Sequence, residues 1–360
     1  MQVMTGTITS VSPLHFGSGR ARGTFSQTLS YVPGRTLRGM FGWYLYQYNR
    51  DLFDACGLAE DHDPERMSLF FRNGYPLSEG ERSVYAPVKS RWCKKCGALI
   101  ENEDNECEQV NEGRLCLHEG KKFSGLVGKR TFSEKRLVTT DLVPKRLETK
   151  CPIRRDGHTS MGDGWTLSPY HVEGIEPGVS FGFMMVADDL VADDVVLSLN
   201  EASYACGLGG FRSRGYGLVN VSVDMKVSDD EYIAKRAGNF STEDEYLLIL
   251  NAPCILRSGA SSMIGIDMSF FEAINRRLES KGYKGDICPG SDPAPYITRS
   301  VVRGWSLKNG NMVDEIVPAN GPGSCVVVSG SPSSLAALEV YGVGDLQSCG
   351  YGEMFISGVI

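Results

Sequence analysis

A cluster of cysteines between residues 93 and 118 has the spacing of a metal site. Cys93 and Cys96 form a Cys-x-x-Cys pair followed directly by a glycine, and Cys107, Cys116 and His118 come after it. Thiolate sulfur and imidazole nitrogen are the ligands of structural zinc sites, which hold the metal with four such groups. We expect one structural Zn²⁺ bound by Cys93, Cys96, Cys107 and Cys116, with His118 as the alternative to Cys107. Unbound thiols are a second interpretation, and a redox dithiol is disfavoured because no thioredoxin-like βαβ pattern surrounds the pair.

Two glycine-rich stretches share the template G-x-G-x-x-x-S-x-G-Y-G. They read GLGGFRSRGYG at residues 207–217 and GVGDLQSCGYG at residues 342–352, and each lies between a helical pattern and a strand-like apolar run. A dinucleotide-binding glycine motif follows a strand and opens a helix, so the order found here excludes it. A tight helix-to-strand connection is one interpretation of both. The second stretch has Gln347 and Cys349 in place of arginines, and we expect it to be mainly structural or to bind a neutral group.

The first glycine stretch also has the residue types of an RNA contact. Glycines let the backbone approach a phosphate or ribose closely, and successive N–H groups form an anion-binding nest. Arg212 and Arg214 would supply positive charge, while Phe211 or Tyr216 would stack on a base. The sequence therefore predicts that residues 207–217 touch the backbone of an RNA.

The N-terminal segment adds a second positive region. Residues 1–50 contain five arginines and no acidic residue, although the whole chain of 360 residues has a net charge of −7. That net charge excludes a protein that coats nucleic acid non-specifically, but it does not exclude a local basic groove. Within this segment, His15, Arg20 and Arg22 lie in or beside a glycine-bearing loop and are candidate RNA contacts. A less favoured interpretation makes His15 a general base for RNA cleavage.

The order of the predicted elements suggests a repeated scaffold. Each half of the chain ends with a helix, a glycine stretch and a strand, as in the split βαβ arrangement of the ferredoxin-like fold. We predict an α+β protein with two ferredoxin-like domains, residues 1–227 and 228–360. Residues from about 74 to 170 form an irregular insertion in the first domain, which holds the cysteine cluster and a basic run at 129–150. No signal peptide or membrane-spanning run is visible, and eleven scattered cysteines indicate a reducing cytoplasm.

Two segments, YVPGRTLRGMFGWYL and GLGGFRSRGYGLVNV, resemble the RAMP superfamily of CRISPR-associated proteins. That superfamily pairs such a helix start with a glycine-rich loop before the last strand of a ferredoxin-like fold of the RNA-recognition type. The chain is most similar to the Cas-five group of type III effectors, and within it to the type III-D subunit called Csx-ten. The similar features are the two glycine stretches, the zinc-type insertion, RGWSLKNG and VPANGPGSCVVV. The resemblance implies RNA contacts at the helix start, where the free N–H groups favour a phosphate, and along the first glycine stretch. The positions that match the family motifs are Gly34, Arg35, Thr36, Arg38, Gly207, Gly209, Gly210, Arg212, Ser213, Arg214, Gly215 and Gly217, and Phe211 and Tyr216 lie among them as the stacking candidates named above.

The resemblance implies a non-catalytic RNA-binding subunit of a type III CRISPR effector complex, acting in antiviral defence. Such subunits hold the 5′ tag of the guide RNA and bridge the large signalling subunit to the backbone RAMP subunits. The basic run at 129–150 then matches the family's extended hairpin, which separates guide nucleotides; a solvated charged loop is the alternative.

We expect no enzyme activity, because residues 15–30 lack the acid that target-cleaving relatives carry in this loop. One alternative is a RAMP endoribonuclease that processes precursor guide RNA, with His15 as its only candidate base. Another is a protein-only scaffold, which would leave Arg212 and Arg214 without a role.

Overall fold

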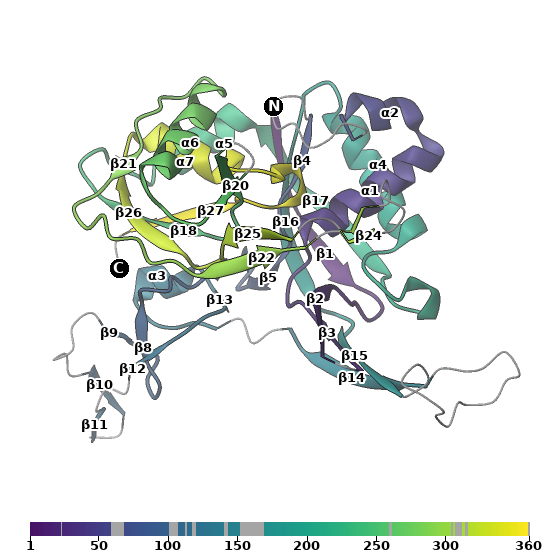
Figure 1. The fold of residues 1–360 in the computed structure, drawn as a ribbon, viewed down its shortest axis with the longest axis horizontal. Coiled ribbons are helices and arrows are strands. Elements are labelled where there is room, and N and C mark those ends of the chain that lie inside the picture. Colours follow the sequence, from purple (N-terminus) through teal and green to yellow (C-terminus); the bar gives the residue numbers. More distant parts are fainter. Residues whose placement is uncertain are drawn as a thin grey trace, which may run out of the picture.

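Alternating apolar residues at the N-terminus form strand β1 (Gln2–Ser10), which lies inside an antiparallel sheet. Buried and less buried residues alternate along β1 because successive side chains of a strand point to opposite faces. The strand order of this first sheet is β17-β1-β16-β5-β6, and β4 also pairs with β16 (Figure 1). Its other strands are β4 (Leu69–Phe71), β5 (Tyr75–Ser78), β6 (Glu81–Arg82), β16 (Ser180–Ala187) and β17 (Val219–Ser228). The structure is a computed structural model that describes the chain except residues 23, 59–67, 101–106, 112–113, 117–119, 140–142, 152–168, 259–260, 304, 307–311, 314–315 and 359–360.

The second half of the chain builds another antiparallel sheet, with the order β21-β26-β18-β27. Its strands are β18 (Tyr246–Leu250), β21 (Cys288–Pro289), β26 (Cys325–Ser329) and β27 (Met354–Gly358). In both sheets the last strand pairs with the first, and the first pairs with the third, which is the order of the ferredoxin-like βαββαβ fold. The predicted α+β class is therefore confirmed.

Helices and short elements complete each half. The helices are α1 (Gly34–Tyr48), α2 (Arg50–Ala55), α3 (Arg130–Glu134), α4 (Ala192–Cys206), α5 (Asp229–Ala237), α6 (Met268–Glu279) and α7 (Pro332–Tyr341), with 3-10 turns η1 (Arg212–Arg214) and η2 (Gln347–Cys349). Short strand pairs of the second half are β19 (Leu256–Ser258) with β20 (Ser261–Met263), β22 (Arg299–Val302) with β25 (Val317–Asn320), and β23 (Trp305–Ser306) with β24 (Met312–Val313). Within the described part of the chain, no helix is both long and apolar enough to cross a membrane.

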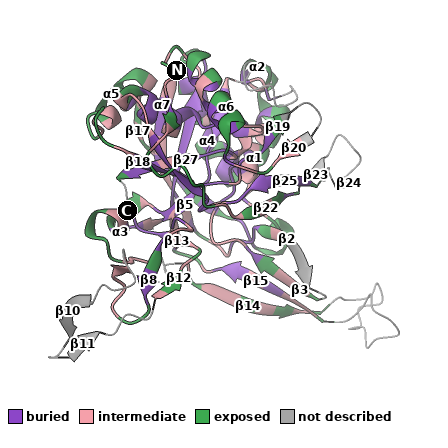
Figure 2. Cartoon of the chain, turned by 60° about the vertical axis from the view of Figure 1, so that its left-hand side comes forward, coloured by how far each residue is buried: buried purple, intermediate pink, exposed green. Residues whose placement is uncertain are grey.

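The apolar faces of both sheets are covered by the chain itself. One face of the first sheet, with Met4 and Phe181, packs against α1 and α4. Its other face, with Val3 and Met184, shares a core with α5, α6 and α7 of the second half. The second sheet uses one face for that same core, and Phe132 of α3 packs on the other. Figure 2 shows the buried residues gathered in these central strands. An RNA would therefore have to bind at loops and edges and not on an open sheet face.

Two projections extend from this body (Figure 1). One holds β7 (Val84–Tyr85), β8 (Arg91–Cys93), β9 (Leu99–Ile100), β10 (Cys107–Asn111), β11 (Arg114–Cys116), β12 (Gly120–Lys122) and β13 (Leu126–Val127). The other, called the arm here, is the sheet β14-β15-β3-β2, with β2 (Gly17–Arg22), β3 (Phe25–Thr28), β14 (Lys145–Lys150) and β15 (Tyr170–Ile175).

The insertion in the first half begins later in the chain than the sequence predicts. The predicted insertion started at residue 74, but β5 and β6 belong to the first sheet. The basic run 129–150 does not form one hairpin: α3 packs beneath β27 through Phe132 and Phe355, and only residues 145–150 join the arm. The division into domains at residues 227 and 228 stays a prediction, because a single core contains side chains of both halves.

Candidate nucleic-acid interface

The two glycine stretches have the same backbone conformation. Phe211 and Leu346 begin the turns η1 and η2 in the left-handed region, with φ/ψ of 58°/23° and 57°/28°. Gly215 and Gly350 end them at 85°/12° and 86°/12°. The shared sequence template is therefore a shared structure, because the same positions require a positive φ that glycine adopts without steric cost.

Several of these glycines are needed for packing inside the protein. A Cβ on Gly209 would lie 2.6 Å from the carbonyl oxygen of His15, and one on Gly344 would lie 2.3 Å from that of Ile255. Their φ angles, 91° and 92°, are equally unfavourable for other residues. Gly207 is also enclosed, with the Gly217 carbonyl 3.1 Å from its Cβ position. At these positions the glycines serve a tight helix-to-strand connection, because the atoms closest to them belong to the chain's own backbone.

The exposed side of the first glycine stretch carries a cation between two aromatic rings. The guanidinium carbon of Arg214 lies 5.6 Å from the ring centres of both Tyr170 and Phe211. Phe211 in turn packs at 5.9 Å from Tyr216. Arg214 and Ser213 are exposed, as are Gly210 and Gly215, so this surface is open to a ligand. Such an arrangement suits base stacking next to a phosphate contact.

Arg212 has a different role from its neighbour Arg214. Its Nη1 donates to the carbonyl of Cys206 at 2.8 Å, and its stem lies against Gly217, whose Cβ position is 3.2 Å from the Arg212 Cγ. Cys206 is the last residue of α4, so the guanidinium supplies a donor and a positive charge to the helix C-terminus. Arg212 therefore stabilises the loop, although its exposed part remains accessible.

His15 does not lie on the predicted RNA surface. Its residue is 4% exposed and lies below Phe211, with 4.9 Å between ring centres. Its Nδ1 is 2.7 Å from the carbonyl oxygen of Glu173, and its Nε2 is 3.2 Å from the hydroxyl of Ser26. Both ring nitrogens are engaged within the chain, so His15 is a packing residue and is poorly placed to accept a proton from RNA. The side chains of Arg20 and Arg22, on β2 beside it, lie outside the described part of the structure.

The start of α1 is covered by the second glycine stretch. The N–H of Gly34 donates to Oδ1 of Asn73 at 2.8 Å, and its Cβ position is 2.9 Å from the Cα of Gly350. The N–H of Thr36 donates to Pro33 at 2.9 Å. The expectation that Gly34 offers a free N–H to a phosphate is therefore wrong. Arg38, one turn on, lies with its Nη2 3.4 Å from the carbonyl of Leu58.

A groove of about 640 Å³ lies beside this helix start, between the two halves of the chain. Arg35 is one of its cations, and its Nη1 donates to the carbonyl of Arg303 at 2.5 Å. Lys145, at the start of β14, contributes a second and is paired with Glu173 at 3.4 Å. None of the described lining residues is acidic: Ser18, Gln27, Thr28, Leu29, Ser30, Tyr31, Pro33, Arg35, Asn73, Pro76, Tyr85, Phe123, Gly125, Leu126, Val143, Lys145, Pro253, Ser300, Val301, Val302, Arg303, Pro322, Cys349 and Tyr351. The groove combines positive charge, hydroxyl groups and aromatic rings, as nucleic-acid sites do.

The aromatic hydroxyls of the groove remain protonated at neutral pH. Burial raises the pKa of Tyr85 to about 12 and raises that of Tyr31 further. Burial also raises the pKa of Tyr351, against the opposing effect of Arg35. These three phenols are thus neutral hydrogen-bond donors, and the charge of the groove comes from its arginines and lysine.

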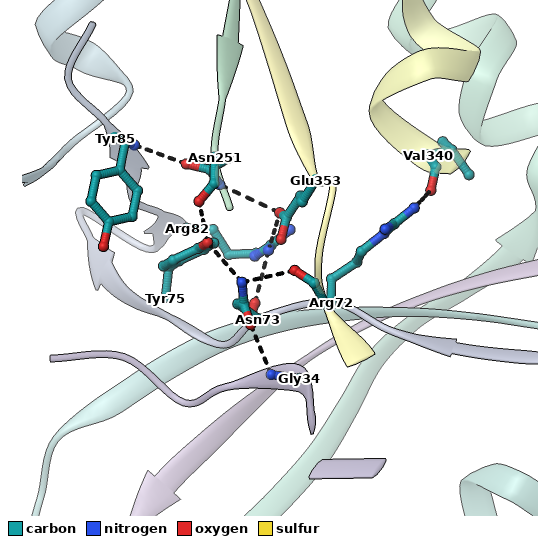
Figure 3. Close-up of polar contacts among 10 residues, drawn as sticks. Gly34, Arg72, Asn73, Tyr75, Arg82, Tyr85, Asn251, Val340 and Glu353 are labelled. Carbon is teal, nitrogen blue, oxygen red and sulfur yellow. Dashed lines mark hydrogen bonds and ion pairs between the residues drawn. The ribbon is translucent and has the colours of Figure 1, made fainter. Parts of the chain in front are cut away.

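A buried polar network, shown in Figure 3, fixes the wall between the two halves. Asn73 donates from its side chain to the carbonyl of Gly350 at 3.1 Å and to the hydroxyl of Tyr75 at 3.0 Å. The hydroxyl of Tyr75 donates to the carbonyl of Asn251, and Asn251 accepts from the N–H of Tyr85 at 2.8 Å. Sequence reasoning missed these residues; the signal available was polar side chains within the strand-like run FFRNGYPL.

Two arginines from the first half complete this network. Arg82 donates to Oε1 of Glu353 at 2.6 Å and to the carbonyl of Asn73 at 2.9 Å. Arg72 donates to the carbonyl of Val340 at 2.5 Å, in the last turn of α7. Burial lowers the pKa of Arg72 to about 10, so it is still charged at neutral pH.

The structure describes only part of the cysteine cluster. Cys93 and Cys96 flank a turn in which the N–H of Gly97 donates to the Cys93 carbonyl at 3.0 Å, with φ of 73° at Gly97. Cys107 and Cys116 are directly opposite each other in the β10–β11 pair. Their side chains and His118 lie outside the described residues, and no group of three or more ligand side chains is present among those that are described. The four-cysteine Zn²⁺ site stays a prediction.

Comparison with known proteins identifies the family. The model of the RAMP superfamily matches residues 7–220. No curated protein sequence matches the chain. Among solved structures, a chain of the type III-B Cmr-β complex bound to cognate target RNA is 15% identical, with 91% of this chain and 86% of that one covered and a TM-score of 0.46.

Two further solved structures are similar across nearly the whole chain. A chain of the Csm3–Csm4 subcomplex of a type III-A CRISPR-Cas interference complex is 12% identical, with 99% of each chain covered and a TM-score of 0.45. A RAMP protein binding different RNA substrates is 9% identical over 99% of each chain, with a TM-score of 0.37. Because the family model spans more than half of the sequence, this chain belongs to the RAMP superfamily.

Proposed function

We propose that this chain is a non-catalytic RNA-binding subunit of a type III CRISPR effector complex. It holds the 5′ tag of the guide RNA and bridges the large signalling subunit to the backbone RAMP subunits, as in the Cas-five group and its type III-D member Csx-ten. The observation that carries this proposal is the groove beside α1, which contains Arg35, Lys145 and Arg303 and no acidic residue among its described lining. In a member of the RAMP superfamily, such a groove is best explained by RNA.

Strand β14 connects the groove to the first glycine stretch and gives the RNA a continuous path. Lys145 begins the strand and lines the groove, while Lys150 ends it with its Nζ 5.2 Å from the ring centre of Tyr216. The six residues of β14 span about 17 Å. An RNA strand that leaves the groove along β14 therefore arrives at the exposed side of the first glycine stretch, where Arg214 lies. The faces of the two central sheets are covered, and β14 carries three cations along this route, Lys145, Arg146 and Lys150, which are paired with Glu173 and Glu148 in the free chain.

The endoribonuclease alternative loses the candidate base that the sequence offered, among the residues that the structure describes. His15 was its only candidate in a suitable loop, and both ring nitrogens of His15 contact groups of the chain. Cleavage needs a group that moves a proton in the transition state, whereas arginines that bind equally before and after cleavage give no rate gain.

The test measures binding of a single-stranded RNA carrying the guide 5′ tag to the purified chain at several salt concentrations. Each phosphate contact that is lost should lower the salt slope by about 0.7. We expect Arg35→Ala and Arg214→Ala each to weaken binding and flatten this slope. Arg276→Ala, an exposed arginine of α6 remote from the groove lining, is the matched control and should leave both unchanged.

The same samples decide between binding and cleavage. RNA should remain intact with and without Mg²⁺ over the time of the assay. Specific cleavage that His15→Ala abolishes would establish the endoribonuclease instead. Equal affinity and equal salt slope for Arg35→Ala, Arg214→Ala and the unsubstituted chain would refute RNA binding at this interface.

A further inference from the structure

Helix α4 presents a row of large apolar side chains to solvent. Leu190, just before the helix, is 91% exposed, Leu197 is 70% exposed and Tyr204 is 77% exposed. Leu197 and Tyr204 are seven residues apart on α4, so they lie on the same face of the helix about 10 Å from each other, and Leu190 lies in the turn that leads into the helix. A single exposed leucine needs no explanation, but two large apolar side chains on one face of α4, with a third in the turn before it, form an apolar stripe that nothing in the chain covers within the described residues.

A hollow of about 440 Å³ adjoins the middle of this stripe, between α4 and β17. Its apolar walls are Val196, Leu197, Val223 and Met225. β17 is an edge strand among the described strands, so the hollow opens outward at the side of the sheet. A side chain of a partner could enter this hollow while its neighbours pack along the stripe.

The charge around the stripe is negative. Asp193, Asp194 and Glu201 are exposed on α4, and α4 contains no lysine or arginine. Two cations are near: Lys226 of β17 is paired with Asp193, whose side chain remains 86% exposed, and Arg212 donates to the carbonyl of Cys206 at the C-terminal end of the helix. Glu201 accepts a hydrogen bond from the hydroxyl of Tyr44 at 2.5 Å and keeps its negative charge toward solvent. Phosphates are repelled by such a face, so its occupant is a protein and not the guide RNA.

We propose that this α4 face binds a basic amphipathic helix of another protein subunit. A helix is the expected occupant because a seven-residue spacing of apolar side chains is the pattern of a helix–helix seam, whose side chains insert into hollows of the facing helix. The partner helix carries lysine or arginine beside its apolar face, complementary in charge to Asp193, Asp194 and Glu201. The identity of the partner as a subunit of the effector complex rests on the proposed function, but the α4 face contributes no residue to the RNA groove.

The test reconstitutes the complex from the purified chain, guide RNA, large subunit and backbone RAMP subunits. The variant Leu197→Ser with Tyr204→Ser should enter the complex with at least about tenfold lower affinity, because central apolar contacts dominate such interfaces. Met268→Ser, which removes a 63% exposed residue on α6, is the control and should assemble normally. Guide RNA binding by the isolated variant should equal that of the unsubstituted chain, which also shows that the variant is folded.

A photo-crosslinking residue at position 197 of the assembled complex identifies the occupant. A crosslink to a lysine- or arginine-rich helical segment of another subunit supports the proposal. A crosslink to RNA, to an extended strand or to a second copy of this chain overturns it, as does normal assembly of the double variant. Loss of RNA binding by the unsubstituted chain would instead refute the proposed function, so the two failures are separate observations.

Discussion

The ion pair between Arg82 and Glu353 should contribute far more to stability than an equally short pair on the surface. Nη2 of Arg82 lies 2.6 Å from Oε1 of Glu353, and these side chains are 19% and 4% exposed. Nε of Arg257 lies 2.7 Å from Oδ2 of Asp345, but both of those side chains are 41% exposed. The two pairs differ little in distance, so a comparison of them isolates the effect of burial.

Removing one charge has different consequences at the two places. Glu353→Gln keeps the shape of the side chain but leaves the Arg82 guanidinium buried without a carboxylate. A fully buried partner left this way costs about 3–5 kcal/mol, and the residual exposure of Arg82 reduces our expectation to about 2–3 kcal/mol. Asp345→Asn leaves Arg257 without its carboxylate, but water already solvates this guanidinium. The substitution should therefore cost less than about 1 kcal/mol of stability.

Urea unfolding followed by far-ultraviolet circular dichroism measures both variants. We expect one transition for the whole chain, because the core shared by β1, β16, α5 and α7 joins the halves. Glu353→Gln should lower the midpoint clearly, while Asp345→Asn should move it little at an unchanged slope. Equal losses, or a larger loss for Asp345→Asn, would show that burial of the pair between the halves does not stabilise the fold.

Three further experiments test other parts of the structure. The purified chain should contain about one zinc per molecule by elemental analysis and lose it in Cys93→Ser; metal-free protein prepared without chelator would contradict the four-cysteine site. Gly344→Ala should destabilise by about 3 kcal/mol or more, because its φ is 92° and its Cβ would lie 2.3 Å from a carbonyl oxygen. Gly215→Ala should cost only about 1–2 kcal/mol, because Gly215 has a positive φ but open space around its Cβ position. Equal losses of stability for the two variants in thermal melts would argue against a packing role for Gly344. Burial raises the pKa of the Cys254 thiol to about 12, so little reactive thiolate forms there near neutral pH and the reagent cannot reach it, whereas the side chain of Cys288 is exposed. Mass spectrometry should therefore find iodoacetamide on Cys288 long before Cys254, and similar rates would contradict the burial of Cys254.

The sequence predicts the repeated scaffold well because its signals are local. The glycine template places left-handed backbone at fixed positions, and the apolar patterns on either side decide helix and strand. The structure has the same turn at Phe211 and at Leu346, and both halves have the strand order of the ferredoxin-like fold. These features depend on residues close together in the chain, so a single sequence contains the information that determines them.

The contacts of the site were predicted less well because they join distant segments. Gly34 matches the helix-start motif, yet its N–H donates to the side chain of Asn73 and Gly350 packs against its Cα. His15 has the side chain of a general base, yet it lies beneath Phe211 with both nitrogens engaged. Residue type and spacing describe what a side chain can do, whereas burial and partners decide whether an external ligand can reach it.

The difference between the two glycine stretches follows from such a distant contact. Arg212 donates to the carbonyl at the end of α4, and the second stretch has Gln347 at the equivalent position. There the end of α7 receives its positive charge from Arg72 of the first half, which donates to Val340. Gln347 is only 3% exposed, so a second guanidinium beside that of Arg72 would be buried next to a like charge. The missing arginines thus reflect the docking of the second stretch on the first half. The first stretch has its outer side toward solvent, and its Arg214 is exposed there.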